Sequence, residues 1–200
     1  MRQQADLLLE YGHIVSGIAG ASVSRRRFLA LAAWGTAAAF MPGIAAAARP
    51  LPGVREVSFH NLHTDERVTA VYCEAGEYVP AALEEIDTIL RDHRTGEICQ
   101  ISPRLIDLVY ALRVRLGSTG PVQVISGYRS PATNDLLRAE GGGGVAERSL
   151  HLTGEAVDIR FEDRSLRRVR DAALALRAGG VGYYPRPGFV HVDVGRLRRW

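Results

Sequence analysis

One ten-residue segment carries most of the information about the fold of this chain. It reads Ser149-Leu150-His151-Leu152-Thr153-Gly154-Glu155-Ala156-Val157-Asp158. Two side chains that can bind a metal ion, His151 and Asp158, stand seven residues apart, and a straight strand of that length would separate them by roughly 23 Å. They can bind the same ion only if the chain folds back between them. Gly154 is able to take the positive φ of a tight turn, so the segment predicts a turn at Thr153-Gly154 that brings His151 beside Asp158.

A second informative segment lies near the end of the chain, in Phe189-Val190-His191-Val192-Asp193-Val194. The period of a strand puts His191 and Asp193 on one face and the three valines on the other, where we expect them in the core. Two imidazoles and one carboxylate suit a catalytic zinc ion, which keeps its fourth position for water. We therefore predict a Zn²⁺ site formed by His151, Asp158 and His191. Asp193 lies beside His191, where it can orient that ring, accept a proton or pair with an arginine.

The remaining segments alternate between helical and extended patterns. Hydrophobic spacing predicts helices over 80–93, 102–117 and 164–177, and a short helix over 130–139. Apolar runs and alternation predict strands over 55–62, 67–72, 121–125 and 152–161, and a hairpin over 181–194. Four glycines predict a flexible loop at 141–144. This order of elements predicts an α+β fold, in which a small antiparallel sheet is flanked by helices.

Composition limits the number of domains and the class of partner. The chain has 200 residues, which leaves room for one compact domain once a targeting segment is removed. The chain has 25 arginines and no lysine, and its formal net charge is +3. This charge favours an anionic partner such as a cell-wall polymer. The two cysteines, Cys73 and Cys99, lack the spacing of a CxxC motif, and the sequence leaves open whether they form a disulfide.

The N-terminal segment has the features of an export signal. Ser24-Arg25-Arg26-Arg27-Phe28-Leu29 precedes an uncharged run over 28–48 that ends in small residues. This order is typical of a twin-arginine signal with a cleavage site. We therefore expect an export signal at 1–48, a mature domain at 49–200 and a periplasmic location. A retained membrane anchor is the alternative, because an apolar stretch of about 20 residues can span a bilayer.

The two segments together resemble a known group of zinc peptidases, which includes D-alanyl-D-alanine dipeptidases and carboxypeptidases, lysostaphin-like enzymes and the hedgehog signalling fold. The pattern of the group is Ser-x-His-x-x-Gly-x-Ala-x-Asp with a distant His, and this chain matches it at Ser149, His151, Gly154, Ala156, Asp158 and His191. Within the group the chain is most similar to the MepK (YcbK) branch of murein endopeptidases. That similarity is carried by Ser126-Gly127-Tyr128-Arg129-Ser130-Pro131, Gly182-Tyr183-Tyr184-Pro185 and the segment around His191, and it covers about 54–200.

The resemblance also implies roles for individual residues. It implies that His151, Asp158 and His191 bind the metal. It places Arg129 near the scissile carbonyl, where a guanidinium can stabilise an oxyanion, and it implies that Ser149 contacts substrate. The dipeptidase branch has a catalytic Glu three residues before its last His, and here that position is Gly188. The general base is thus left open, with Asp193 as the first choice and Glu155 as the second.

These observations predict a zinc metallopeptidase that acts as a murein endopeptidase and hydrolyses amide bonds in peptidoglycan stem peptides or cross-links. The enzymatic alternative is a D,D-carboxypeptidase or dipeptidase. The alternative from another class is a non-catalytic, zinc-containing module that binds the cell wall. We expect peptidoglycan as the partner, no nucleic acid, and no stable membrane insertion after the signal is cleaved.

Overall fold

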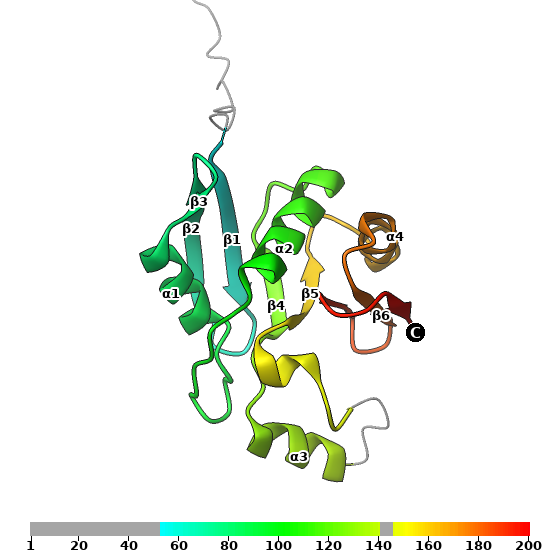
Figure 1. Ribbon diagram of the computed structural model, residues 1–200. Helices are drawn as coiled ribbons and strands as arrows, with labels where there is room; N and C mark the ends of the chain where they lie inside the picture. The colour runs from blue at the N-terminus through cyan, green and yellow to red at the C-terminus, as the bar shows by residue number, and fades with distance from the viewer. Residues whose placement is uncertain (1–52, 141–145) are drawn as a thin grey trace, which may run out of the picture. The chain divides into compact units, whose positions relative to one another are not determined.

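An eight-stranded sheet runs through the part of the chain that the computed structural model describes, residues 53–140 and 146–200 (Figure 1). Its strand order is β3-β2-β1-β4-β5-β7-β6-β8, in which only the pairs β1–β4 and β6–β8 are parallel. The strands are β1 (Arg55–Asn61), β2 (Arg67–Glu74), β3 (Glu77–Tyr78), β4 (Val122–Ser126), β5 (Ala156–Phe161), β6 (Gly180–Tyr184), β7 (Phe189–Asp193) and β8 (Arg198–Arg199). The expected export signal at 1–48 and the loop expected at 141–144 lie outside the described residues.

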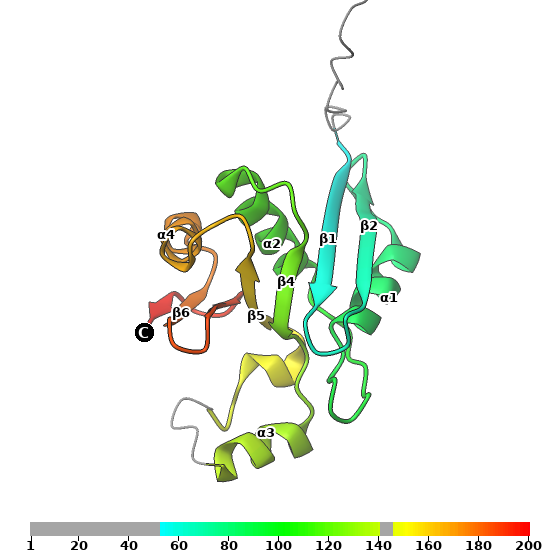
Figure 2. The ribbon, with the colours of Figure 1, turned by 180° about the vertical axis from the view of Figure 1, so that it is seen from behind.

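Three helices cover one face of this sheet (Figures 1 and 2). They are α1 (Pro80–Ile89), α2 (Pro103–Leu116) and α4 (Leu166–Leu176). The remaining α-helix, α3 (Pro131–Ala139), lies at one end of the sheet together with a short 3₁₀ helix, η2 (Leu150–Thr153). The predicted α+β class, with a mostly antiparallel sheet and flanking helices, is confirmed, although the sheet has more strands than we expected.

The core lies between the three helices and the sheet. Val157 and Ile159 of β5 and Val190 and Val192 of β7 are fully buried there, as the alternation of β7 predicts. They join buried side chains of the helices, among them Ile86, Leu105, Leu112, Val169 and Ala173. Because side chains alternate along a strand, Asp158 and His191 point to the opposite face, which the three helices leave free.

The predicted strand over 152–161 is shorter than we expected. Leu150–Thr153 form the 3₁₀ helix η2 instead, and β5 begins at Ala156. Between them Gly154 has a φ of +67°, and a Cβ at this position would lie 2.4 Å from the backbone oxygen of Gln100. The amide of Ser102 also donates to the oxygen of Gly154 at 2.9 Å. The turn at Gly154 is therefore packed against the loop that contains Gln100 and Ser102.

Cys73, which is buried, and Cys99, which is half-buried, are both free thiols.

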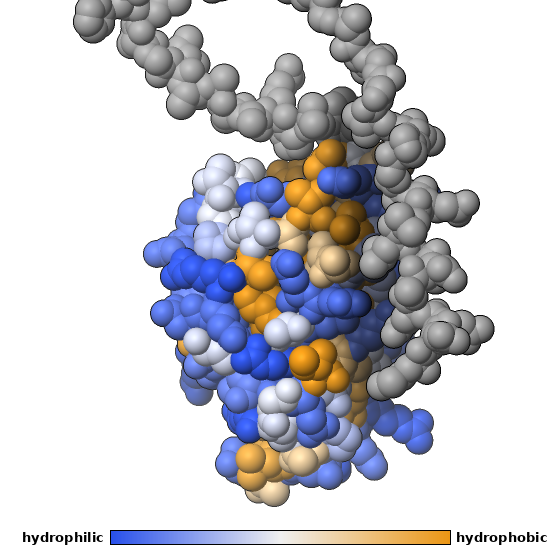
Figure 3. Space-filling view, turned by 90° about the vertical axis from the view of Figure 1, so that its left-hand side faces the viewer, coloured by the Kyte–Doolittle hydropathy of each residue, from blue (hydrophilic) through white to orange (hydrophobic). Residues whose placement is uncertain are grey.

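The face shown in Figure 3 is mainly hydrophilic, and its hydrophobic residues form separate patches. Among the described residues, no helix combines the length and the apolar character needed to cross a membrane.

Candidate metal centre

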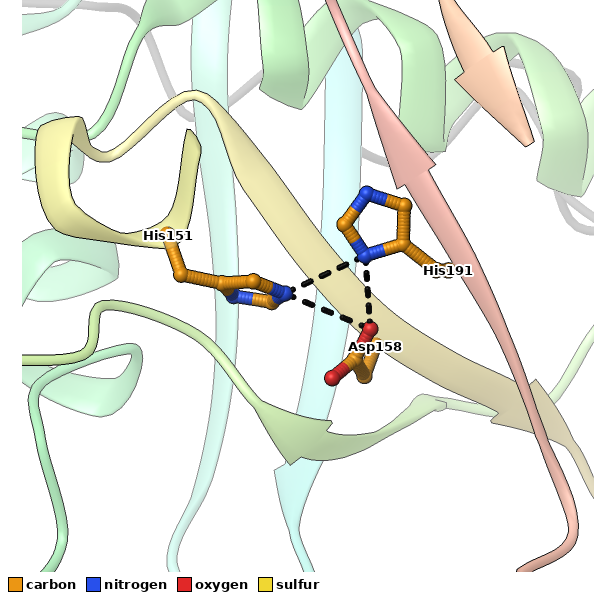
Figure 4. A group of neighbouring side chains, drawn as sticks. All are labelled: His151, Asp158 and His191. Carbon is orange, nitrogen blue, oxygen red and sulfur yellow. Dashed lines mark hydrogen bonds and ion pairs between the residues drawn. The ribbon is translucent and has the colours of Figure 1, made fainter. Parts of the chain in front are cut away.

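Three side chains from separate elements converge on one point (Figure 4). His151 comes from η2, Asp158 from β5 and His191 from β7. The Oδ1 atom of Asp158 lies 2.9 Å from Nδ1 of His191 and 3.3 Å from Nε2 of His151, and the two nitrogens are 3.2 Å apart. Ligands bound at about 2.0–2.1 Å with tetrahedral angles lie roughly 3.3 Å from one another. The three atoms therefore have the spacing of ligands around one small metal ion.

The ring of His151 is oriented by the backbone of the loop that follows β4. Its Nδ1 lies 2.7 Å from the carbonyl oxygen of Gly127, which can only accept a hydrogen bond. Nδ1 therefore carries the proton, and the Nε2 lone pair faces Asp158. The carbonyl of His151 in turn accepts from the amide of Arg129 at 3.1 Å, so the histidine and this loop fix each other.

His191 is oriented in the same way from the other side. Its Nε2 lies 3.1 Å from Oδ2 of Asp193, and a proton on Nε2 leaves the Nδ1 lone pair directed at Asp158. Two imidazole lone pairs and a carboxylate oxygen then face one another with no proton between them. Such a set of acceptors is stable when a cation lies among them, so these residues fit a metal ion.

The electrostatic environment keeps both nearby carboxyl groups ionised. Burial raises the pKa of Asp158, but His151 and His191, which carry positive charge and donate to its carboxylate when a proton rather than a metal ion lies between them, outweigh this effect and hold the pKa well below the usual range. Burial likewise raises the pKa of Asp193, and hydrogen bonds from His191 and from backbone amides outweigh it. A metal-binding carboxylate and a carboxylate behind a metal-binding histidine both need this charged form.

Arg129 lies beside the three candidate ligands and is buried. Its Nη2 is 3.5 Å from both Asp158 Oδ2 and Ser126 Oγ, which are weak contacts. Its Nε is buried and has no hydrogen-bond partner among the described residues. Burial lowers the pKa of Arg129, and the charge of Asp158 opposes this effect. The guanidinium therefore keeps a donor that no described residue uses.

Arg129 is anchored through its neighbour in the loop. The carboxylate of Asp92 accepts from the amide of Ser130 at 2.9 Å, and the Ser130 hydroxyl caps α3 by accepting from the amide of Thr133 at 3.2 Å. These bonds hold the backbone on both sides of Ser130, so they limit the positions that the Arg129 side chain can take.

A cleft of about 280 Å³ opens onto the three candidate ligands. Arg129 and Ser149, both predicted to act on substrate, line it, and Ser149 also accepts from the amide of His151 at 3.4 Å. Sequence reasoning assigned no role to four other lining residues, Tyr184, Phe189, Arg198 and Trp200. Gly182 could have indicated two of them, because a glycine inside a strand often marks a place where another group lies close to the backbone. A Cβ at that position would lie under 3 Å from the rings of both Tyr184 and Trp200.

The two candidate bases lie away from the point where the ligands meet. Asp193 contacts the far side of the His191 ring, and it also accepts from the amides of Gly180 and Gly195 and from Arg198. Glu155 accepts from the Thr153 hydroxyl at 2.8 Å and does not line the cleft. Among the described residues, Asp158 is therefore the one residue with a carboxylate side chain that lines the cleft.

Comparison with known proteins identifies the family of this chain. A family described as "Peptidoglycan L,D-endopeptidase MepK" matches residues 49–200. The chain is 44% identical over 177 residues to the peptidoglycan L,D-endopeptidase MepK of Escherichia coli strain K12, which covers 88% of this chain and 97% of the relative. It is 35% identical over 178 residues to the probable peptidoglycan L,D-endopeptidase MepK of Haemophilus influenzae, covering 88% and 95%. These matches confirm the predicted resemblance to murein endopeptidases and the prediction of a peptidase. The chain belongs to the peptidoglycan L,D-endopeptidase MepK family.

Proposed function

We propose that this chain is a zinc-dependent peptidoglycan L,D-endopeptidase that hydrolyses an amide bond in stem peptides or their cross-links. The observation that carries the proposal is the convergence of His151, Asp158 and His191, with donor atoms 2.9–3.3 Å apart at the base of a cleft. The names of the similar proteins point to the same bond class.

Zinc is the proposed metal because the donor set has two imidazoles and one carboxylate. This set is typical of catalytic zinc sites, which keep one position open, whereas structural sites are closed by four protein ligands. When bound, zinc would polarise the scissile carbonyl and lower the pKa of a water molecule. The three residues hold the ion, and the cleft admits the substrate.

The other residues have roles that follow from their contacts. Arg129 lines the cleft and its Nη2 makes only weak contacts of 3.5 Å, which supports a role in binding the carbonyl oxygen as it gains negative charge. Ser149 lines the same cleft and supports a substrate contact. For Asp193, contact with the far side of His191 supports an orienting role over that of general base. Glu155 contacts Thr153, so we assign it no part in catalysis.

The proposal extends to the location of the protein. Similar proteins are named as acting on peptidoglycan, which lies outside the cytoplasm, so the chain must be exported to meet this substrate. We propose that residues 1–48 are a twin-arginine signal, that the mature domain at 49–200 acts in the periplasm, and that its fold is of the type found in D-alanyl-D-alanine peptidases and the hedgehog domain.

Digestion of purified peptidoglycan followed by separation of the products tests the proposed function. An endopeptidase converts cross-linked muropeptide dimers into monomers, which is the expected result. Release of terminal D-alanine alone would instead support the carboxypeptidase. Binding to peptidoglycan without any new product would support the non-catalytic module. The His191→Ala variant is the control, because it removes a proposed ligand and should yield no product.

A further inference from the structure

The cleft contains a tyrosine whose hydroxyl is held by a second aromatic residue. Tyr184 ends β6, and its ring stacks on that of Phe189 with centroids 4.6 Å apart. Its oxygen accepts a hydrogen bond from Nε1 of Trp200 at 2.6 Å. Both Tyr184 and Trp200 line the cleft that contains the three candidate metal ligands and Arg129.

Trp200 is half exposed, and its backbone and its ring both contact β6. Its amide donates to the oxygen of Val181 at 3.2 Å, and its carbonyl accepts from the amide of Tyr183 at 3.0 Å. Its ring lies over Gly182, where a side chain would collide with it, and is 5.2 Å from the ring of His191. The indole N–H is thus a positioned donor to the Tyr184 oxygen.

This contact determines where the phenolic proton of Tyr184 can point. An indole N–H only donates, so the Tyr184 oxygen must be the acceptor in this bond. The Tyr184 hydroxyl therefore keeps its own proton for another acceptor, and no described residue of the chain accepts it. A hydroxyl that already accepts a hydrogen bond is polarised into a stronger donor. The donor lines the cleft and is available to a bound ligand.

We propose that Tyr184 is a catalytic residue that donates a hydrogen bond to the oxyanion formed at the scissile carbonyl, together with Arg129. This inference rests on the proposed endopeptidase function. When water releases one proton to solvent and the resulting hydroxide adds to the carbonyl carbon, a C–O bond forms, the C=O π electron pair moves to the carbonyl oxygen, and the negative charge there attracts both donors. Tyr184 keeps its proton throughout this step. Trp200 is a positioning residue that acts through Tyr184.

The neighbouring residue provides a matched control. Tyr183 points to the opposite face of β6, where its ring lies under the guanidinium of Arg170 at 4.9 Å, and it does not line the cleft of the candidate ligands. Tyr184→Phe and Tyr183→Phe each remove one phenolic oxygen from the same strand. Only Tyr184→Phe should affect the cleft.

The first readout is the kinetics of dimer cleavage with zinc bound. We expect Tyr184→Phe to lower kcat by 10- to 10³-fold, on the order of the loss seen when one oxyanion donor is removed, with KM within about threefold and zinc content unchanged. Trp200→Phe should cause a smaller loss in kcat, because the phenol stays but is free to rotate. Equal kcat values for Tyr184→Phe, Tyr183→Phe and the wild type would overturn the proposal.

The second readout is independent of turnover. A phosphinic dipeptide, in which a tetrahedral phosphorus replaces an L,D peptide bond, presents a charged oxygen like that of the oxyanion. Its Kd should rise roughly 10- to 100-fold in Tyr184→Phe, the effect of losing a hydrogen bond to a charged group, and stay constant in Tyr183→Phe. An unchanged Kd in Tyr184→Phe would overturn the role of Tyr184. Absence of cleavage by the wild type would contradict the endopeptidase function, and the Kd comparison would still decide about Tyr184.

Discussion

Asp193 contacts His191 from the side opposite to Asp158. This placement distinguishes a role in orienting His191 from a role as general base. Its Oδ2 accepts from His191 and Arg198, and its Oδ1 accepts from the amides of Gly180 and Gly195. All four groups are donors, so the residue must present two acceptor oxygens. A carboxylate does this, whereas an amide must turn its NH₂ toward one pair of donors.

We therefore expect Asp193→Asn to weaken zinc binding by 10- to 100-fold, the usual effect of losing a partner behind a ligand histidine. Turnover of the zinc-saturated variant should change far less. Competition with a chromogenic chelator measures the affinity. Glu155→Gln is the matched control and should change neither quantity, because Glu155 contacts Thr153. A normal zinc affinity combined with turnover reduced by 10² to 10⁴ would identify Asp193 as the general base instead.

For individual residues, the sequence predicted which side chains meet at the site. It did not predict the contacts that orient those side chains. His151, Asp158 and His191 could be proposed together because their residue types form a ligand set and a glycine allows the turn between two of them. The carbonyl of Gly127 that orients His151 has no sequence signature, since every residue has a carbonyl. Tyr184 and Trp200 meet only through the pairing of β6 with β8, which no local pattern predicts.

The turn between η2 and β5 joins two of the candidate ligands, and its glycine is confined. Gly154 has a φ of +67°, and Gly188 in the β6–β7 turn has a φ of +83°. A Cβ on Gly154 would lie 2.4 Å from a backbone oxygen, but the nearest atom to a Cβ on Gly188 is 3.8 Å away at the end of a flexible arginine. The two positions share the unfavourable φ and differ in the steric clash.

Gly188→Ala should lower the free energy of unfolding by about 1 kcal/mol, the cost of a positive φ for a residue with a Cβ. Gly154→Ala should lower it by about 3 kcal/mol, because the backbone must also move, and should weaken zinc binding as His151 shifts. Urea unfolding of the metal-free proteins measures both changes. Equal losses for the two variants would show that the contact with Gln100 does not constrain the turn.

The elements that were predicted wrongly or missed are short, or their sequences lack a distinctive hydrophobic periodicity. The alternation of apolar residues at Leu150 and Leu152 is shared by a strand and a 3₁₀ turn, so the start of β5 was placed too early. Strands β3 and β8 have two residues each, too few to show a period. Among the longer elements, α1 ends at Ile89, four residues before its predicted end. In contrast, α2 begins at Pro103 and is followed by Gly117 with a φ of 60°, as its sequence signals indicated.

The described residues, 53–140 and 146–200, form two layers, a sheet and three helices, and the three helices leave one face of the sheet uncovered. Helices α1, α2 and α4 cover the other face (Figures 1 and 2), so the polar side chains of β5 and β7 can form a site without disturbing the core. Fold class followed from the order of the elements. Strand order and the position of the C-terminal residues beside the site depend on contacts between distant segments, which the sequence alone did not predict.

The proposed export concerns the full chain. The proposed signal predicts that replacing Arg25 and Arg26 by Lys leaves the protein in the cytoplasm, because the paired arginines are the proposed recognition element of the export route. Fractionation of cells that produce each form measures the location. Arg167 and Arg168 of α4, replaced by Lys in the same way, are the control and should not alter export. Normal export of the Arg25 and Arg26 variant would rule out the twin-arginine route.

The central claim is that one zinc ion, held by His151, Asp158 and His191, is required for cleavage of peptidoglycan. The most direct measurement adds zinc stepwise to the metal-free protein and follows the conversion of muropeptide dimers into monomers. The account predicts that activity is absent without metal, rises linearly and reaches its maximum at one zinc per chain, and that His151→Ala shows neither tight zinc binding nor cleavage. Full cleavage by the metal-free protein, or by His151→Ala, would contradict it.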